Sequence, residues 1–232
     1  MMGNSSAELI RERLKEIRFQ IEDTCVKCGR RPEDVTLMAV TKTVPAELVN
    51  VAVAEGITLL GENRAQELLE KFDTYTLPAE QIHFIGHLQT NKVRQVIDKV
   101  GMIESVDSLR LATEIERCAA ARGKVMEVLL EVNIAAEPSK NGVLPGELDS
   151  LLEGIAGMPH LKIRGIMVIP PAAEGPRYFE LAQKLLIDIQ GKKLDNRNVN
   201  ILSMGMSFDY REAIRFGSNI VRIGRGLFGE RH

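Results

Sequence analysis

The sequence predicts an α/β protein with one (β/α)8 TIM-barrel domain over residues 1–232. Eight short apolar runs alternate with segments of helical periodicity, a pattern typical of parallel strands joined by right-handed crossovers. The length is close to the roughly 250 residues of a compact barrel. No linker or low-complexity stretch divides the chain. An open, doubly wound sheet is the alternative arrangement of the same elements.

The first predicted element is an amphipathic helix over residues 5–28. Its apolar side chains recur at helical spacing at Leu9, Ile10, Leu14, Ile17 and Ile21. Because this helix precedes the first strand, we expect residues 1–30 to form an extra element packed on the barrel.

The eight predicted strands are short runs of aliphatic and β-branched residues. They lie at 35–42, 58–62, 82–86, 102–106, 127–134, 162–169, 200–206 and 219–224. Between them, Pro45, Ser108 and Ser207 occupy positions typical of helix starts. The glycines expected to end these three helices are Gly56, Gly123 and Gly217.

The composition argues against several classes of function. Thirty Lys and Arg residues against 32 Asp and Glu residues give a net charge of −2, without the basic field that a nucleic-acid partner would favour. No apolar run approaches the roughly 20 residues of a membrane span. The first residues lack a signal-peptide pattern and the cysteine count is odd, so we expect a cytoplasmic protein without disulfides.

The pair Cys25 and Cys28 has the spacing of half a zinc site or of a redox motif. No second pair accompanies it and no strand precedes it, so we interpret both cysteines as structural. No other metal-ligand spacing occurs in the sequence, and we expect no metal site.

Lys42 is the first candidate functional residue, because it ends the first predicted strand and precedes a helix start. An amine at the carboxyl end of a buried strand loses water, which makes its charge costly to hold. Only the neutral amine attacks a carbonyl, so Lys42 is a candidate for Schiff-base chemistry. The alternative is a lysine with its stem on the core and its amine in water.

A candidate phosphate site lies in the loops after the seventh and eighth strands, where barrels often bind phosphate. Ser203-Met-Gly-Met-Ser207 places Ser207 at an expected helix N-terminus, and Arg222-Ile-Gly224-Arg-Gly226 lets the backbone approach a ligand closely. The alternative is that Ser207 only caps a helix and the glycines only form turns. A lysine imine beside a phosphate site indicates pyridoxal phosphate or a sugar phosphate.

Three further segments are expected on the same rim of the barrel. Asn63 follows the second strand, either as a site residue or as the N-cap of a helix over Arg64–Phe72. The loop 86–92 follows the third strand. Lys140 is a second amine, which we interpret as a solvated loop lysine, and His83 is expected to be packed.

Seven short motifs occur in order along the chain. They are Ala39-Val-Thr-Lys42, Gly61-Glu-Asn63, His83-Phe-Ile-Gly86, Leu88-Gln-Thr-Asn-Lys92, Ser139-Lys-Asn-Gly142, Ser203-Met-Gly-Met-Ser207 with Asp209, and Val221-Arg-Ile-Gly224 to Phe228-Gly229. As a set they closely resemble the pyridoxal phosphate homeostasis protein family, from about residue 35 to residue 230. That family is similar to the N-terminal barrel of alanine racemase, a type III pyridoxal-phosphate fold.

The resemblance implies a role for each candidate residue. Lys42 would form the Schiff base with pyridoxal 5′-phosphate, and Asn63 would lie beside the ring. Ser207 and the backbone at Gly224 and Arg225 would hold the phosphate.

Arg222 would face the cofactor, either at the pyridine nitrogen or at the phosphate. An arginine cannot protonate the ring nitrogen, so the ring would be a poor electron sink, which suits a carrier. Arg225-Gly226 stands where the family usually has small or hydroxyl residues, which could alter the phosphate loop.

Three functions are compatible with these residues. The first, which we favour, is a monomeric, non-catalytic pyridoxal phosphate carrier in cofactor homeostasis, with pyridoxal-phosphate-dependent apoenzymes as partners. The second is an amino-acid racemase; racemases of this fold take an opposing tyrosine from a C-terminal β domain, whereas this sequence ends at His232. The third is a Schiff-base aldolase, whose lysine usually lies in a later strand.

Overall fold

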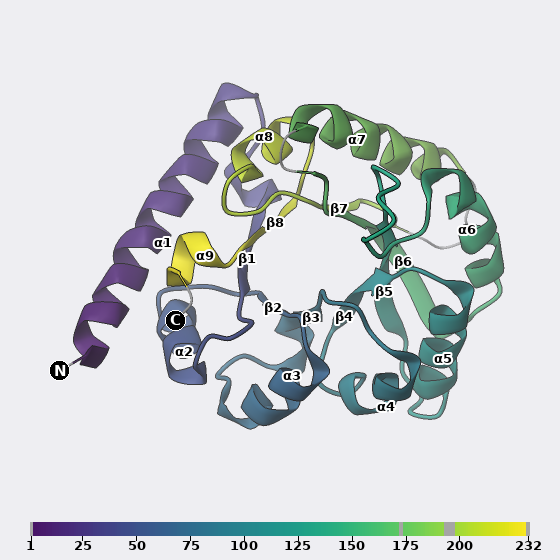
Figure 1. The fold of residues 1–232 in the computed structure, drawn as a ribbon, viewed down its shortest axis with the longest axis horizontal. Coiled ribbons are helices and arrows are strands. Elements are labelled where there is room, and N and C mark those ends of the chain that lie inside the picture. The colour runs from purple at the N-terminus through teal and green to yellow at the C-terminus, as the bar shows by residue number, and fades with distance from the viewer. Residues whose placement is uncertain (1, 172–173, 193–197, 231–232) are drawn as a thin grey trace.

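The computed structural model describes residues 2–171, 174–192 and 198–230. Eight parallel strands form a closed barrel in the chain order β1 to β8. The barrel closes because β1 pairs with β2 on one side and with β8 on the other (Figure 1). The predicted (β/α)8 barrel is therefore confirmed, and the open sheet is excluded.

Each predicted apolar run overlaps one strand. The strands are β1 Thr36–Val40, β2 Leu60–Glu62, β3 Ile82–Phe84, β4 Met102–Val106, β5 Met126–Val132, β6 Leu161–Val168, β7 Ile201–Ser203 and β8 Ile220–Ile223. Most are shorter than predicted, because burial continues past the last paired residue. Met204, for example, is fully buried although β7 ends at Ser203.

Helices alternate with the strands and form an outer ring around the barrel (Figure 1). The α-helices after the first strand are α2 Ala46–Ala54, α3 Ala65–Lys71, α4 Val93–Val96, α5 Leu109–Ala120, α6 Leu148–Ala156, α7 Gly175–Gly191, α8 Tyr210–Arg215 and α9 Arg225–Phe228. Short 3-10 turns are η1 Pro32–Asp34, η2 Phe72–Thr74, η3 Ala79–Gln81, η4 Thr90–Lys92 and η5 Pro145–Glu147. The predicted caps at Pro45 and Ser108 are confirmed; the Ser108 hydroxyl accepts from the Leu111 N–H at 3.4 Å.

The predicted N-terminal helix is α1, Met2–Lys27, which packs on the outside of the barrel against α2, α8 and α9 (Figure 1). Its buried apolar side chains are Ile10, Leu14, Ile17, Ile21 and Cys25. Leu9, which we included in the apolar stripe, is instead 44% exposed. Arg30 fixes the end of the helix by donating to the carbonyls of Ile214 (2.6 Å) and Ser218 (2.7 Å).

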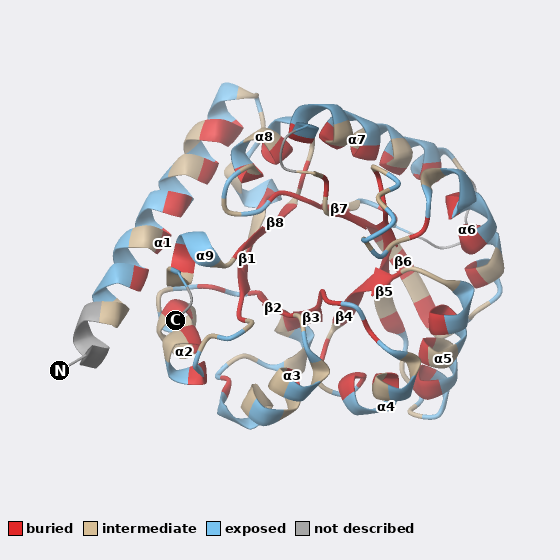
Figure 2. Cartoon of the chain, in the orientation of Figure 1, coloured by how far each residue is buried: buried red, intermediate tan, exposed pale blue. Residues whose placement is uncertain are grey.

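Burial is concentrated in the strands and on the inner faces of the helices (Figure 2). Two small apolar clusters, separate from the main core, include Met38 of β1 and Met167 of β6. The buried residues also include Glu104 and Arg222, two ionisable side chains of the barrel strands. None of the helices in the described ranges has the length and apolar character needed to cross a membrane.

Candidate functional site

Lys42 lies at the carboxyl-terminal rim of the barrel, two residues after β1 ends at Val40. It lines a cavity of about 160 Å³ with apolar walls from Val40, Ile85 and Ile169. All six residues predicted as cofactor contacts line this one cavity: Lys42, Asn63, Ser207, Arg222, Gly224 and Arg225. The fold therefore brings together segments that are up to 183 positions apart in the chain, since Lys42 and Arg225 are both in the lining.

Ser207 connects the two loops predicted to hold phosphate. The prediction that it caps a helix is wrong, because α8 begins at Tyr210 and Asp209 occupies the N-cap position. Asp209 Oδ1 instead accepts from the Met206 N–H at 2.6 Å, which forms a turn before the helix. Ser207 Oγ accepts from the Gly226 N–H at 3.0 Å, so its own hydrogen can point to another acceptor.

Gly226 allows the loop after β8 to approach the loop after β7. A Cβ atom at this position would lie 3.1 Å from Cγ2 of Ile223 and 3.3 Å from Oγ of Ser207, which is tighter than most real contacts. The neighbouring Arg225 is exposed, and its guanidinium lies 5.8 Å from the ring centroid of Phe208. The Arg225-Gly226 pair thus combines close backbone packing with a positive charge at the mouth of the cavity.

Asn63 does not cap the following helix, so the capping alternative is wrong. Helix α3 begins at Ala65, Arg64 takes the N-cap position, and no side chain caps it. Asn63 Oδ1 is buried and has no hydrogen-bond partner among the described residues. Since buried polar atoms are usually bonded, the unpaired oxygen of this cavity-lining residue is a candidate acceptor for a ligand that donates a hydrogen bond.

Arg222 starts a hydrogen-bonded chain that crosses the barrel interior. Its Nη1 donates to Ser203 Oγ at 2.7 Å, and its Nη2 donates to the carbonyl of Val168 at 2.9 Å. Ser203 Oγ donates to Glu104 Oε2 at 2.6 Å, and Glu104 Oε1 lies 2.6 Å from Nδ1 of His83. His83 is buried, as predicted, and this chain extends from β8 through β7 and β4 to β3.

The surroundings of Glu104 favour its charged form. Burial acts to raise the pKa of Glu104, but the bond and charge of His83, the charge of Arg222 and the Ser203 hydroxyl hold it below its usual value. Burial lowers the pKa of Arg222, and the nearby carboxylates of Glu104 and Glu131 oppose that shift. The interior of the barrel thus contains a compensated pair of opposite charges.

Glu131 of β5 is a buried carboxyl without such compensation. Burial, followed by the negative charge of Asp107, raises the pKa of Glu131 to about 7, and only Arg222 opposes the shift. We did not identify Glu104 or Glu131 from the sequence. The signal was a carboxylate inside a mostly apolar strand, Glu104 in MIESV of β4 and Glu131 in MEVLLEV of β5.

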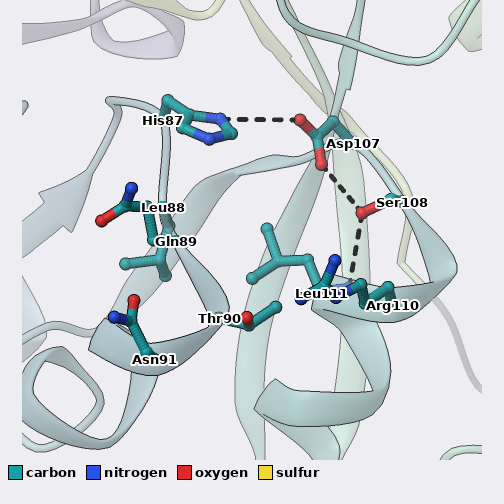
Figure 3. Close-up of a pocket in the computed structure, with 9 residues that line it drawn as sticks. All are labelled: His87, Leu88, Gln89, Thr90, Asn91, Asp107, Ser108, Arg110 and Leu111. Carbon is teal, nitrogen blue, oxygen red and sulfur yellow. Dashed lines mark hydrogen bonds and ion pairs between the residues drawn. The ribbon is translucent and has the colours of Figure 1, made fainter.

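The rim loop 86–92 does not line the Lys42 cavity but a separate pocket of about 480 Å³ (Figure 3). Its lining residues are His87, Leu88, Gln89, Thr90, Asn91, Asp107, Ser108, Arg110 and Leu111. His87 Nδ1 lies 3.8 Å from Asp107 Oδ2, and the Ser108 hydroxyl donates to Asp107 Oδ1 at 3.0 Å. These contacts are internal to the loop and the start of α5.

The second rim amine, Lys140, is tied to the protein surface. Its Nζ lies 2.6 Å from Oε1 of Glu137 and donates to the carbonyl of Ile169 at 3.3 Å. Lys140 is half-buried and does not line the cavity that contains Lys42.

The fold and the site define a (β/α)8 barrel of the alanine racemase type, and the model of the family described as "Alanine racemase, N-terminal domain" matches residues 14–232. The pyridoxal phosphate homeostasis protein of Escherichia coli K12 is 38% identical over 226 residues, which covers 96% of this chain and 97% of the relative. That of Aquifex aeolicus is 40% identical over 228 residues, covering 95% and 97%. The chain therefore belongs to the pyridoxal phosphate homeostasis protein family, as its motifs predicted.

A solved structure supports the same grouping. PipY of Synechococcus elongatus, determined with pyridoxal phosphate bound, matches with a TM-score of 0.80 and 32% sequence identity. The match covers 95% of this chain and all of PipY.

Proposed function

We propose that this protein is a pyridoxal 5′-phosphate carrier in cytoplasmic cofactor homeostasis, which holds the cofactor at Lys42 and releases it with little or no catalytic turnover. One observation carries the proposal: a single cavity contains an amine, a serine hydroxyl between two glycine loops, and a buried amide oxygen without a partner. The names of the curated relatives and the cofactor bound to PipY support it.

Lys42 would form a reversible covalent link. Its Nζ adds to the aldehyde carbon of the cofactor, a C=N bond replaces the C=O bond, and the oxygen leaves as water. The bound group supplies this aldehyde and a conjugated ring that withdraws electrons. Water reverses the reaction, so the same link can both retain and release the cofactor.

The other polar residues of the cavity fit the remaining groups of the cofactor. The Ser207 hydroxyl, the backbone at Gly224 and Arg225, and the Arg225 charge would contact the phosphate. Asn63 Oδ1 would accept a hydrogen bond from the ring hydroxyl. This set explains every polar group in the cavity wall except Arg222.

We assign Arg222 to the ring nitrogen, not to the phosphate. Both of its terminal nitrogens are bound inside the barrel, to Ser203 and to the carbonyl of Val168, and not to the phosphate loops. A guanidinium does not give up its proton near neutral pH, so the ring nitrogen would remain unprotonated. The ring would then stabilise a carbanion poorly, which favours storage over turnover.

The positions of the tyrosines support a carrier over a racemase. A racemase needs a second acid or base on the face of the ring opposite the lysine. The chain has three tyrosines, and none of them lines the cavity as the described residues define it. The Tyr75 hydroxyl donates to Glu62, and the Tyr210 hydroxyl donates to Gln20 of α1.

The test is to incubate the purified protein with the cofactor, record its visible spectrum, reduce it with borohydride and map the modified peptide. We expect an absorbance of the C=N link and a modification at Lys42. An equal yield at Lys140, or no modification, would contradict the proposal. Enzyme-like exchange of the α-proton of L-alanine in deuterated water, abolished by Lys42→Ala, would favour the racemase; transfer to an apoenzyme would support the carrier.

A further inference from the structure

The two peptide groups that flank Lys42 are both held by side chains of α3. Lys71 Nζ donates to the carbonyl oxygen of Thr41 at 3.1 Å. Glu67 Oε2 accepts from the backbone N–H of Thr43 at 2.7 Å. Glu67 and Lys71 also form an i,i+4 ion pair with an N–O distance of 3.0 Å, so one pair of side chains spans the backbone of Lys42.

This pair, which we call the α3 pair, is positioned to act on Lys42 without touching a ligand. Neither Glu67 nor Lys71 lines the Lys42 cavity. Their side chains are only 16% and 15% exposed, so solvent screens the ion pair between them weakly. Although burial acts to raise the pKa of Glu67, the Thr43 N–H and Lys71 hold it below its usual value, so Glu67 is charged near neutral pH.

The backbone at Thr43 has a conformation that requires support. Its φ is +61°, in the left-handed region that a β-branched residue rarely adopts. In the described part of the chain, only Ala136 shares a positive φ among residues other than glycine. Such conformations persist where neighbouring contacts hold them, and they cluster at functional sites. The Glu67 carboxylate bonds the N–H of this same residue.

A buried carboxylate behind the α3 pair fixes Lys71 in turn. Glu62, at the end of β2, is fully buried, and its Oε1 lies 3.9 Å from Lys71 Nζ. The same oxygen accepts from the hydroxyl of Tyr75. Lys71 therefore lies between two carboxylates and a backbone carbonyl, which leaves its ammonium group little freedom.

We propose that Glu67 and Lys71 are positioning residues for Lys42: by holding the peptide groups on both sides of it, they direct its amine into the cavity and stabilise the covalent link to the cofactor. This inference rests on the proposed function, because it concerns the same amine. The inference predicts different effects on the affinities of two ligands. The α3 pair should strengthen binding of a ligand that reacts with the amine, and should not change the affinity for a ligand of the same shape that does not react.

The test compares two ligands across matched variants of the full chain. Pyridoxal 5′-phosphate has the reactive aldehyde, whereas pyridoxine 5′-phosphate has an alcohol in its place. The test variants are Glu67→Ala and Lys71→Met. The control is Glu70→Ala, which removes an exposed carboxylate of the same helix whose hydrogen-bond partner is Gln66.

We expect each test variant to raise the Kd of pyridoxal 5′-phosphate about tenfold, equivalent to roughly 1.4 kcal/mol. The Kd of pyridoxine 5′-phosphate should change less than about twofold, since no bond to Lys42 forms. Glu70→Ala should leave both values unchanged. Glu67→Gln keeps an oxygen that can accept from Thr43 and should lie between the wild type and Glu67→Ala.

Two results would overturn the inference. One is an unchanged Kd for pyridoxal 5′-phosphate in folded variants, and the other is an equal loss for both ligands, which would indicate general damage to the cavity. If Glu67→Ala does not fold, Glu67→Gln and Lys71→Met decide the question. Lys42→Ala separates the two proposals: if it removes the trappable link while the α3 pair variants bind normally, only the positioning role fails.

Discussion

The two walls of the cavity hold their functional groups by different means. On the amine wall, formed by the loops after β1 and β2, charged side chains of α3 hold the backbone around Lys42. On the phosphate wall, formed by the loops after β7 and β8, backbone groups and the Ser207 hydroxyl make the contacts, and Gly226 lets the loops approach. The amine wall is supported by an ion pair and contains a strained residue, whereas the phosphate wall depends on a serine hydroxyl, glycine backbone and the charge of Arg225.

This difference matches the tasks of the two walls. A covalent bond forms only when the amine meets the aldehyde carbon in a narrow range of directions, so the lysine backbone has to be fixed. A phosphate accepts hydrogen bonds from many directions, so donors in a flexible arrangement suffice. Substitutions on the amine wall should therefore affect one reaction, and those on the phosphate wall should affect every phosphorylated ligand.

The largest effect is expected for Lys42→Ala, which removes the amine itself. The variant should lose the absorbance of the C=N link completely and yield no borohydride-trapped adduct. Circular dichroism should show an intact barrel, because Lys42 is half-buried at the rim and lies outside the strands. Phosphate-wall contacts should still let the variant bind pyridoxine 5′-phosphate; loss of this binding as well would show that the walls are not independent.

A second large effect is expected at Arg222 of β8, which lines the cavity and is linked through Ser203 to Glu104. Arg222→Met would leave Glu104 buried beside His83 without the opposing charge of the arginine. Removing one partner of a buried charge pair costs about 3–5 kcal/mol. Urea unfolding should reveal a loss of this order in the free protein. A loss below about 1 kcal/mol would mean that His83 alone compensates Glu104.

The sequence was sufficient to predict the fold and six of the residues that line the cavity. Eight apolar runs alternate with segments of helical periodicity, and this pattern predicts the barrel. The runs are recognisable because burial on both faces of a parallel strand requires continuous apolar residues. Lys42, Ser207 and Gly224 were identifiable because barrels place function at the carboxyl ends of strands. The helix cap expected at Ser207 was wrong, because Asp209 competes for the same role and Ser207 bonds to a loop 19 positions away.

The α3 pair was not predictable from the sequence. Glu67 and Lys71 look like an ordinary i,i+4 ion pair on a helix, which is common on solvated surfaces. Their contacts with Thr41 and Thr43 depend on how closely α3 packs against the loop after β1. That packing is a tertiary property, and no local pattern encodes it.

A smaller effect on stability is expected from Glu131, a buried residue of β5 that belongs to neither wall. Its folded-state pKa of about 7 exceeds its ordinary value of 4.5. Between these values the folded protein binds more protons than the unfolded chain, so stability decreases as pH rises from about 4.5 to 7. At pH 8, Glu131→Gln should be more stable than the wild type by roughly 3 kcal/mol, since the pKa difference between about 7 and 4.5 corresponds to about 1.4 kcal/mol per pKa unit.

The measurement is the difference in unfolding free energy between Glu131→Gln and the wild type at pH 5 and at pH 8. Other titrating groups are the same in both proteins and cancel in this difference. An equal difference at both pH values would show that Glu131 titrates normally and that Arg222 compensates it fully.

The smallest effect is expected for Ser207→Ala on the phosphate wall. The substitution removes one neutral hydroxyl, whose net contribution as a hydrogen-bond donor is about 1 kcal/mol, or about a fivefold increase in Kd. Because the lost contact involves the phosphate, pyridoxal 5′-phosphate and pyridoxine 5′-phosphate should weaken equally, whereas binding of unphosphorylated pyridoxal should not change. This pattern is the opposite of the one expected for Glu67→Ala, which should weaken only the ligand with an aldehyde. Isothermal titration of the three ligands against both variants tests the comparison directly. If Ser207→Ala weakened pyridoxal as much as its phosphate, the hydroxyl would act on the ring or on Lys42, and the division of the cavity into an amine wall and a phosphate wall would be wrong.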